Sequence, residues 1–468
     1  MSTKYFVEIT ASNKKQLVNL QKFELDLFPP TVKIADKDKF TIEGLITLDE
    51  VNKLVGNGYK VFVKKEAIKK TPAVEEIIPF QNFVEKREQS FREAKEKAGT
   101  TTSDVPPSSS LLLMPPSFDG YLSSAGIDSA LQYTAKSYPD ITELIVLPEK
   151  THEKRTCKMI KIGKKNAISK NGILFLGGVH AREILNPDML VKLSLDLCHA
   201  YTSKTGLTFG GKSYRDKNIQ QIIETTELYI FPLVNPDGRS FVQSPAGDVW
   251  WRKNRNPNPG LQAPGVDLNR NYDFLWDSGI GTSTNPTKDI YRGGTSNSEP
   301  ETKNVIHVIN KYQNIRCLID VHSYSELILY PWGDDENQTI DPNMNFRNPD
   351  YDGYRGHPYD SIYKEYIHKK DLDWYDSVGK KIRNAIAAVR GKVYEVQPSM
   401  NLYPTSGTCH DYVYTLKYNG ANRHIMGYTI ETATRFQPPY SEAVNVMSEV
   451  SAGLIEACLE HSDTMGVR

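Results

Sequence analysis

The segment that decides the fold is ILFLGGVH (173–180), which continues through ARE (181–183) into NPDMLVKLSLDLCHAY (186–201). The first part is an unbroken apolar run, which is typical of a strand buried on both faces. The second part repeats its apolar residues at helical spacing. A buried strand that leads directly into a helix predicts an α/β unit with helices packed on the sheet.

The same pattern recurs along the rest of the chain. Further apolar runs are ELYIFPLVN (227–235), RCLIDVHSY (316–324) and IMGYTIET (425–432), and further helical stretches are 298–312 and 377–391. This alternation predicts one large α/β domain over residues 118–468, with a mixed, mostly parallel sheet flanked by helices. Ser298 and Glu301 have the spacing of a helix capping box. The stretch from Gly333 to Asp371 is rich in Asn, Asp, Tyr and Pro and predicts a long surface loop.

Residues 1–95 predict a separate small α/β domain, an open sandwich whose sheet carries helices on one face. Strands are expected at 4–9, 39–46 and 59–65, and helices at 13–23 and 48–58. A charged helical stretch follows. Residues 96–117 are rich in Ser, Thr and Pro, which is typical of a linker.

Composition excludes several classes of protein. The 468 residues carry 57 basic and 57 acidic side chains, so the formal net charge is zero. Balanced charge argues against a nucleic-acid or anionic-membrane partner. The N-terminus has no apolar stretch fit for a signal peptide, which favours a cytoplasmic location. The five cysteines are scattered without a CxxC pair, so neither a disulfide scaffold nor a zinc ribbon is expected.

Candidate metal ligands stand at the ends of apolar runs. His180 and Glu183 lie three residues apart after the first run, and His322 ends another. Strand ends line the ligand crevice of an open α/β sheet. Two histidines and one glutamate leave a zinc coordination position open for water, as in catalytic sites. A lone HxxE pair is common by chance, and the other histidines are interpreted as packing or surface residues.

Other polar residues extend this candidate site. Arg252 lies in WWRKNR (250–255), and Asn269 and Arg270 lie in GVDLNRNYD (265–273). Guanidinium and amide groups bind carboxylates well, although a single arginine is usually a solvated surface charge. Glu431 ends the last apolar run, so four runs deliver polar residues to one region.

The segment GLTFGGKS (206–213) matches the phosphate-binding pattern GxxxxGK[ST]. That loop requires a preceding apolar strand and a following helix. Here the preceding segment is polar and helical. A glycine-rich loop between helices is therefore expected, and a nucleotide-hydrolysing enzyme is the weaker alternative.

Taken together, the motifs resemble the zinc metallocarboxypeptidases of the carboxypeptidase A/B type, and their sequences are most similar to those of the bacterial carboxypeptidase T branch. The segments that carry the resemblance occur in the family's order over residues 118–460: GGVHAREILNPD, PLVNPDGR, WWRKNR, VDLNRNYD, YRGGTSNSEPET, DVHSYSELILYPWG, LYPTSGTCHDY and YTIET.

The resemblance implies an enzyme that binds one Zn²⁺ ion and releases the C-terminal residue of peptides or proteins. It assigns the metal ligands to His180, Glu183 and His322. It assigns the general base to Glu431 and the oxyanion-stabilising residue to Arg252. The remaining assignments concern the substrate: Asn269 and Arg270 clamp its terminal carboxylate, Arg182 is an outer contact, Tyr403 closes over it, and His410 occupies the position that sets side-chain preference.

Two features depart from the family pattern. Basic-specific relatives carry an acid at the position of His410, and hydrophobic-specific relatives carry an aliphatic residue. We therefore expect a broad or hydrophobic and aromatic preference. The loop from Gly333 to Tyr403 and the stretch from Tyr403 to Glu431 are also expected to be longer than in the pancreatic members.

The N-terminal unit resembles the family's inhibitory activation domain. This predicts a zymogen that an activating protease cleaves between Val84 and Ser117, for example near Lys86 and Arg87. A permanently attached scaffold domain is the alternative. Other functions left open are a zinc amidohydrolase acting on small acylated amino acids and a non-catalytic binding protein of this fold. Family members are commonly secreted, which is the alternative to the cytoplasmic location.

Overall fold

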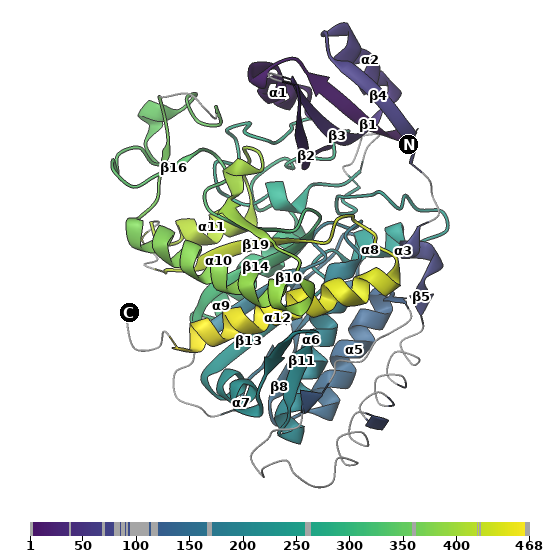
Figure 1. Cartoon of the computed structure of the whole chain (residues 1–468), viewed down its shortest axis with the longest axis vertical. Coiled ribbons are helices and arrows are strands. Elements are labelled where there is room, and N and C mark those ends of the chain that lie inside the picture. Colours follow the sequence, from purple (N-terminus) through teal and green to yellow (C-terminus); the bar gives the residue numbers. More distant parts are fainter. Residues whose placement is uncertain are drawn as a thin grey trace.

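The computed structural model describes residues 3–36, 39–67, 71–78, 120–165, 171–257, 264–357, 362–418 and 423–463, with single positions at 85, 89, 92, 93, 112, 113 and 420. The larger part contains an eight-stranded sheet in the order β18-β15-β19-β14-β10-β13-β9-β8 (Figure 1). Its strands are β8 (Thr142–Lys150), β9 (Thr156–Ile162), β10 (Asn171–Gly177), β13 (Thr226–Phe231), β14 (Ile315–Ser323), β15 (Leu327–Tyr330), β18 (Glu395–Pro398) and β19 (Met426–Thr432). The four central strands, β19-β14-β10-β13, are parallel to one another, whereas β15 and β9 flank them in antiparallel orientation. The predicted mixed sheet is confirmed.

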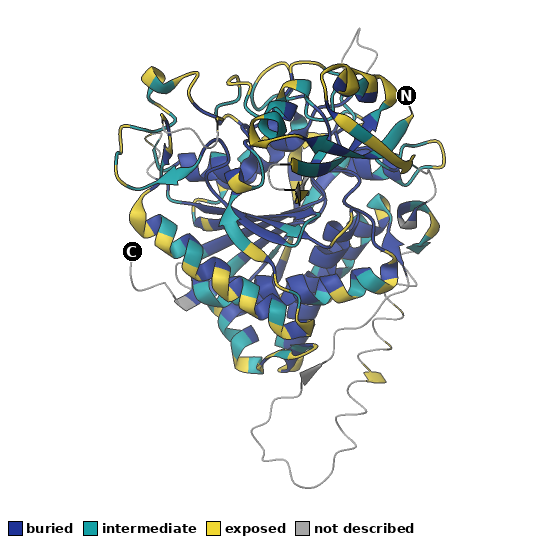
Figure 2. Ribbon diagram, turned by 45° about the horizontal axis from the view of Figure 1, so that its top comes forward, coloured by how far each residue is buried: buried dark blue, intermediate teal, exposed yellow. Residues whose placement is uncertain are grey.

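Helices cover both faces of this sheet. They are α5 (Ser124–Ser137), α6 (Leu185–Ser203), α7 (Asp216–Thr225), α8 (Pro236–Val242), α9 (Pro300–Lys311), α10 (Lys369–Arg390), α11 (Cys409–Thr415) and α12 (Tyr440–Asp463), with short 3₁₀ turns η2 (Leu268–Arg270), η3 (Pro349–Tyr351) and η4 (Ser399–Asn401). Figure 2 shows the sheet buried between helices whose outer faces are exposed. The molecule is thus a three-layer α/β structure.

The alternation along β10 explains the three layers. Ile173 and Phe175 belong to the core cluster on the α6 and α12 side, whereas Leu174 and Leu176 belong to the cluster on the α9 side. Successive strand residues point to opposite faces, so an unbroken apolar run buries both faces at once. Each fully buried Leu or Phe side chain contributes about 1.5–3 kcal/mol.

The N-terminal residues form a four-stranded antiparallel sheet in the order β2-β3-β1-β4. Its elements are β1 (Lys4–Ala11), α1 (Lys14–Asn19), η1 (Leu20–Phe23), β2 (Leu27–Asp36), β3 (Lys39–Thr47), α2 (Leu48–Gly56) and β4 (Lys60–Glu66). The helices α1 and α2 pack against one face through a small apolar core. The expected open sandwich is observed. The strand β2 was not predicted, because its two prolines read as a turn.

The other face of the N-terminal sheet packs on the large domain above its central strands (Figure 1). The contact is a small aromatic cluster that includes Phe6, Phe28, Trp250, Tyr324 and Phe436. The rings of Phe6 and Trp250 meet edge to face at 5.1 Å, as do those of Tyr324 and Phe436 at 4.8 Å. Edge-to-face pairs add about 0.5–1.5 kcal/mol each beyond area burial.

Three local predictions are corrected. The segment 206–213 forms a hairpin of β11 (Gly206–Phe209) and β12 (Lys212–Tyr214), so it is neither a loop between helices nor a phosphate-binding loop. Helix α9 has Glu299 at its N-cap without a side-chain capping bond, so the predicted capping box of Ser298 and Glu301 is wrong. The long loop from Gly333 to Asp371 buries several polar residues instead of lying wholly on the surface.

The predicted linker and cleavage segment lie mostly outside the described residues. This includes Lys86 and Arg87 and all of 96–117 except the short strand β6 (Leu112–Leu113), which pairs with β11. The remaining short elements are α3 (Pro72–Glu75), β5 (Ile77–Ile78), β7 (Tyr121–Leu122), β16 (Asn337–Gln338) and β17 (Glu365–Tyr366).

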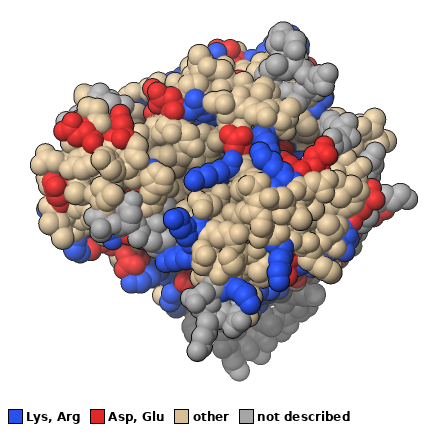
Figure 3. Space-filling model, turned by 90° about the horizontal axis from the view of Figure 1, so that it is seen from above, with Lys and Arg blue, Asp and Glu red and all other residues tan. Residues whose placement is uncertain are grey.

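Two surface features bear on the sequence predictions. Acidic and basic side chains are interspersed on the face seen from above (Figure 3), in keeping with the zero formal net charge. Within the described ranges, no helix is both long and apolar enough to cross a membrane.

The hairpin of β11 and β12 gives a stability prediction. Gly210 has φ +54°, and a Cβ added there would lie 2.2 Å from the Val389 carbonyl oxygen. Gly391 also has positive φ, but a Cβ there meets nothing within 4 Å. We expect Gly391→Ala to lower the free energy of unfolding by about 1 kcal/mol and Gly210→Ala by clearly more, because only the second adds a clash. Urea denaturation of both variants measures the difference; equal losses would contradict this account.

Candidate metal centre and active site

The central parallel strands end at one edge of the sheet and carry the candidate ligands there. His180 and Glu183 lie in the turn between β10 and α6, and His322 lies near the end of β14. This turn begins at Gly178, whose φ of +62° and close contacts with Leu233 and Pro187 leave no room for a side chain. The strand–turn–helix geometry therefore fixes the direction of His180 and Glu183.

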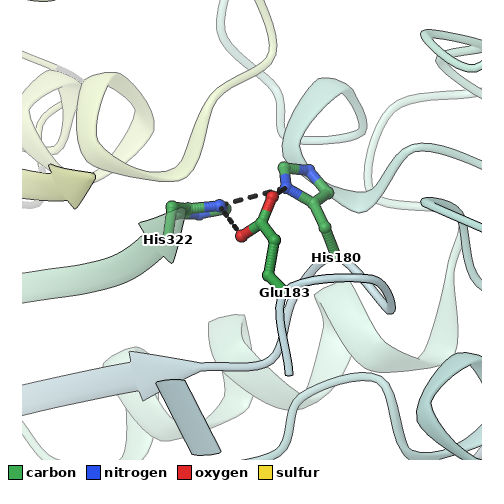
Figure 4. Close-up of side chains that lie close together, drawn as sticks. All are labelled: His180, Glu183 and His322. Atoms are coloured by element: carbon green, nitrogen blue, oxygen red, sulfur yellow. Dashed lines mark hydrogen bonds and ion pairs between the residues drawn. The ribbon is translucent and has the colours of Figure 1, made fainter. Parts of the chain in front are cut away.

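The three side chains converge on one point (Figure 4). His180 Nδ1 lies 2.7 Å from Glu183 Oε1, and His322 Nδ1 lies 3.1 Å from both His180 Nδ1 and Glu183 Oε2. All three residues are buried. Two imidazole nitrogens and a carboxylate within this distance form a donor set suited to zinc.

Two aspartates, which the sequence analysis did not identify, hold the opposite ring nitrogens. His180 Nε2 lies 3.1 Å from Asp267 Oδ1, and His322 Nε2 lies 2.8 Å from Asp320 Oδ2. The second contact is an ion-pair distance without hydrogen-bond geometry. A carboxylate beside Nε2 favours a proton on that nitrogen, which leaves Nδ1 to bind a metal ion. Asp320 could have been found from the sequence, because it precedes His322 by two residues on the same strand face. No sequence signal linked Asp267 to His180.

The charges of these groups fit a cation site. Burial raises the pKa of Glu183, but His180 and His322 outweigh it and hold the pKa well below its usual range. The pKa of Asp267 is likewise lowered despite burial, by Arg252 and His180. Both carboxylates are therefore ionised. A divalent cation would neutralise the negative charge of these buried carboxylates, so the residues present fit zinc.

Glu431 and Arg252 lie beside the donor set without belonging to it. Glu431 lies opposite His322 in the β14–β19 pair. It lines a cavity between the two domains that His180 and Glu183 also line. In the protein chain by itself, burial and Glu183 raise its pKa while His322 and Arg252 lower it, and the net result is a pKa of about 8. Arg252 binds Asp267 Oδ2 through Nε and Nη2, both at 2.9 Å, and this pair does not use Nη1.

The predicted carboxylate clamp lies at the far side of the same cavity. Asn269 Oδ1 accepts a hydrogen bond from the Cys409 backbone at 2.8 Å, which turns the Asn269 amide nitrogen outward as a donor. Arg270 is held by the Gly281 carbonyl at 2.8 Å and contacts the Tyr403 hydroxyl through Nη2 at 3.1 Å. Both clamp residues and Tyr403 line the cavity.

Arg182 lines the cavity, whereas His410 does not. Arg182 forms a two-point ion pair with Asp26 of the N-terminal sheet, at 2.5 and 2.9 Å, and its guanidinium stacks 4.1 Å above the Phe436 ring. His410 is buried behind the cavity wall and is not among the lining residues. Its Nδ1 lies 3.0 Å from Thr429 Oγ1, and burial lowers its pKa to about 3, so the ring is neutral.

The cavity itself has a volume of about 210 Å³ and lies between the two domains. Its floor is the metal centre and the clamp. Its roof comes from the N-terminal domain, from residues of α1, η1, β2 and β3 and the turn between η1 and β2 that include Asp26 and Phe28. The N-terminal domain therefore covers the candidate site.

Comparison with known proteins gives matches over this same region. The zinc carboxypeptidase family matches residues 127–452. Carboxypeptidase A4 from Mus musculus is 29% identical over 283 residues, which are 60% of this chain and 56% of that protein. Metallocarboxypeptidase A from Arthroderma otae is 36% identical over 190 residues, which are 39% of this chain and 41% of that protein. The chain thus spans about half of the length of these relatives.

A solved structure extends the likeness to the whole chain. Carboxypeptidase A from Helicoverpa armigera has a TM-score of 0.67 at 21% identity, over 99% of this chain and 98% of that one. This likeness shows the fold, including the N-terminal sheet. The closer resemblance to the bacterial carboxypeptidase T branch stays a prediction.

The second aspartate gives a test of the metal centre. We expect Asp320→Asn to lower zinc affinity by about 10–100-fold, because the amide no longer orients His322 as a carboxylate does. Titration of the metal-free protein against a competing chelator measures the change. Asp376→Asn, on the exposed side of α10, is the matched control and should bind zinc like the wild type. Equal affinity in both variants would contradict the assigned role of Asp320.

Proposed function

Because the chain belongs to the zinc carboxypeptidase family, we propose that it hydrolyses the C-terminal peptide bond of peptides or proteins, with one Zn²⁺ ion as cofactor. One observation carries the proposal. His180, Glu183 and His322 converge on one point, and the cavity that His180 and Glu183 line also contains a separate carboxylate, Glu431, and a clamp formed by Asn269 and Arg270.

The residues around the ligands divide the chemistry between them. A bound zinc ion supplies Lewis-acid activation of the attacking water and of the scissile carbonyl. Glu431 takes the proton of that water and delivers it to the leaving amine. Glu431 is suited to this exchange because it lines the cavity beside the metal ligands without being one of them.

Arg252 is proposed to stabilise the developing oxyanion. Its guanidinium is fixed by Asp267 before substrate binds, so little reorganisation is needed at the moment of reaction. A preorganised donor of this kind contributes about 3 kcal/mol to transition-state stabilisation. The same Asp267 holds His180, which keeps the oxyanion donor and the metal ligand in register.

Asn269 and Arg270 are proposed to bind the free carboxylate of the substrate. The outward amide nitrogen of Asn269 and the guanidinium of Arg270 offer donors to a planar acceptor. Tyr403 contacts Arg270 and lies where it would close over the terminal residue. A clamp for a free carboxylate at a fixed distance from the metal centre limits the enzyme to the last peptide bond.

The preferred terminal residue is proposed to be apolar or aromatic. The residues that line the cavity include Ile290, Met400 and Leu402. The buried neutral ring of His410 offers no negative charge to a terminal Lys or Arg. A zinc amidohydrolase for acylated amino acids and a non-catalytic binding protein are less well supported, because base, oxyanion donor and clamp are all present. The cytoplasmic location, and secretion as its alternative, stay predictions.

The N-terminal domain is proposed to inhibit the enzyme. Asp26 places a carboxylate on Arg182, and the segment from Leu25 to Phe28 closes the cavity over the metal centre. Two further ion pairs, Lys4–Asp289 at 2.5 Å and Lys288–Glu50 at 2.7 Å, fix the domain to the loop beside the cavity. Peptide substrates would reach the site only after this domain moves or is removed.

Substitution of the general base tests the mechanism. We expect Glu431→Gln to lower kcat by about 10²–10⁴-fold with zinc content unchanged, because the amide cannot accept the proton. Release of the last residue from N-blocked dipeptides with varied C-termini measures both kcat and preference. Glu395→Gln, an exposed glutamate on β18, is the control and should retain full activity. Release that survives Glu431→Gln would overturn the mechanism.

A second substitution tests the inhibitory domain. We expect Asp26→Asn to raise the activity of the full chain about tenfold or more, because a buried charged pair that holds the roof is lost. Limited trypsin treatment of the wild type should raise activity to a similar or higher level. The control Asp49→Asn, at an exposed residue on α2, should leave both the activity of the full chain and its increase after trypsin treatment unchanged. Unchanged activity after both Asp26→Asn and trypsin treatment would favour a permanent scaffold domain.

A further inference from the structure

A second cluster of metal-binding side chains lies outside the cavity. His152 stands in the turn between β8 and β9, and Glu299 and Glu301 stand at the start of α9. One ligand atom from each of these residues lies within 4.8 Å of the others. None of the three belongs to the catalytic donor set or lines the cavity.

The carboxylate of Glu299 is fixed in place by its neighbours. His152 Nε2 lies 2.9 Å from Glu299 Oε2, and the Asn254 and Asn256 amide nitrogens donate to the same oxygen at 2.8 and 2.9 Å. The orientation of the Asn254 amide is settled, because its oxygen accepts from the Val266 backbone at 2.8 Å. The cluster is therefore built in advance of any ligand.

Glu301 is only half satisfied. One of its oxygens accepts a hydrogen bond from Asn254 at 3.0 Å, whereas Oε1 is buried without a hydrogen-bond partner. The residue is 0% exposed. An unpartnered buried carboxylate oxygen is costly unless something binds it.

The charges of the cluster favour a cation. Among the ion pairs of the described residues, Glu299 pairs with His152 alone and Glu301 pairs with no Lys or Arg. Burial, with a smaller contribution from Glu299, raises the pKa of Glu301 to about 7. The simpler alternative is a His152–Glu299 ion pair beside a protonated Glu301.

We propose that His152, Glu299 and Glu301 bind a second divalent transition-metal ion, of which Zn²⁺ is the probe. One imidazole with two carboxylates is a donor set that suits zinc or manganese better than calcium or magnesium. The side chain of His152 is 27% exposed, so an ion reaches the cluster from solvent. On binding, the ion takes the place of the proton between His152 and Glu299.

The bound ion would stabilise the segment that carries the oxyanion donor. Asn254 Nδ2 bonds to both Glu299 and Glu301, and Asn254 follows Arg252 by two residues. The role is therefore structural: the ion ties the start of α9 to the loop of Arg252 and does not touch substrate.

Counting zinc ions per chain tests the proposal independently of activity. The full chain is dialysed against micromolar Zn²⁺, and bound metal is measured by mass spectrometry. We expect two ions in the wild type, one in His152→Gln, one in His180→Gln and none in the double variant. Glu301→Gln, which keeps the side-chain shape, should also bind one. His357→Gln, at an exposed histidine elsewhere, should bind two.

Two outcomes would overturn the proposal: a wild-type chain that binds one ion, or a His152→Gln variant that still binds two. Circular dichroism checks that each variant is folded, and Glu301→Gln decides the matter if His152→Gln does not fold. Failure of this second site leaves the catalytic proposal untouched, because that rests on the ion lost in His180→Gln.

Discussion

The structure of the active site depends on one buried carboxylate, Asp267. Its Oδ1 holds His180 and accepts the Asn269 backbone amide at 3.0 Å, while its Oδ2 holds Arg252. The proposed metal ligand, clamp and oxyanion donor are thus fixed relative to one another through two oxygen atoms. Burying a carboxylate is costly, and the pKa of Asp267, held well below its usual range, shows that its cationic partners offset this cost.

The central sheet supplies the rest of the geometry. Because β14 and β19 are parallel and in register, His322 and Glu431 end side by side, so a metal ligand and a proton acceptor come from neighbouring strands without any further device. The two-sided apolar core holds these strand ends rigidly. Rigid strands place catalytic groups more accurately than mobile loops do.

The N-terminal domain meets this site through two kinds of contact. Its open sheet face carries aromatic rings that pack on the large domain, and Asp26, just before β2, pairs with Arg182. Apolar packing gives the domain its affinity, and the ion pair gives it orientation. One face of the N-terminal sheet packs against α1 and α2, and the other face packs on the large domain. In this position the domain covers the cavity.

The sequence by itself determined the α/β class and the candidate residues at three strand ends, because hydrophobic periodicity and residue order are local properties of the chain. It missed β2 and predicted a loop where β11 and β12 form a hairpin. It also predicted Ser298 as the N-cap of α9, whereas Glu299 occupies that position. Only the tertiary structure paired Asp267 with His180 across 87 residues and Asp26 with Arg182 across 156. Such pairs leave no periodic pattern in the sequence. Their electrostatic attraction becomes strong only where folding buries both charges together, and this burial depends on the tertiary structure.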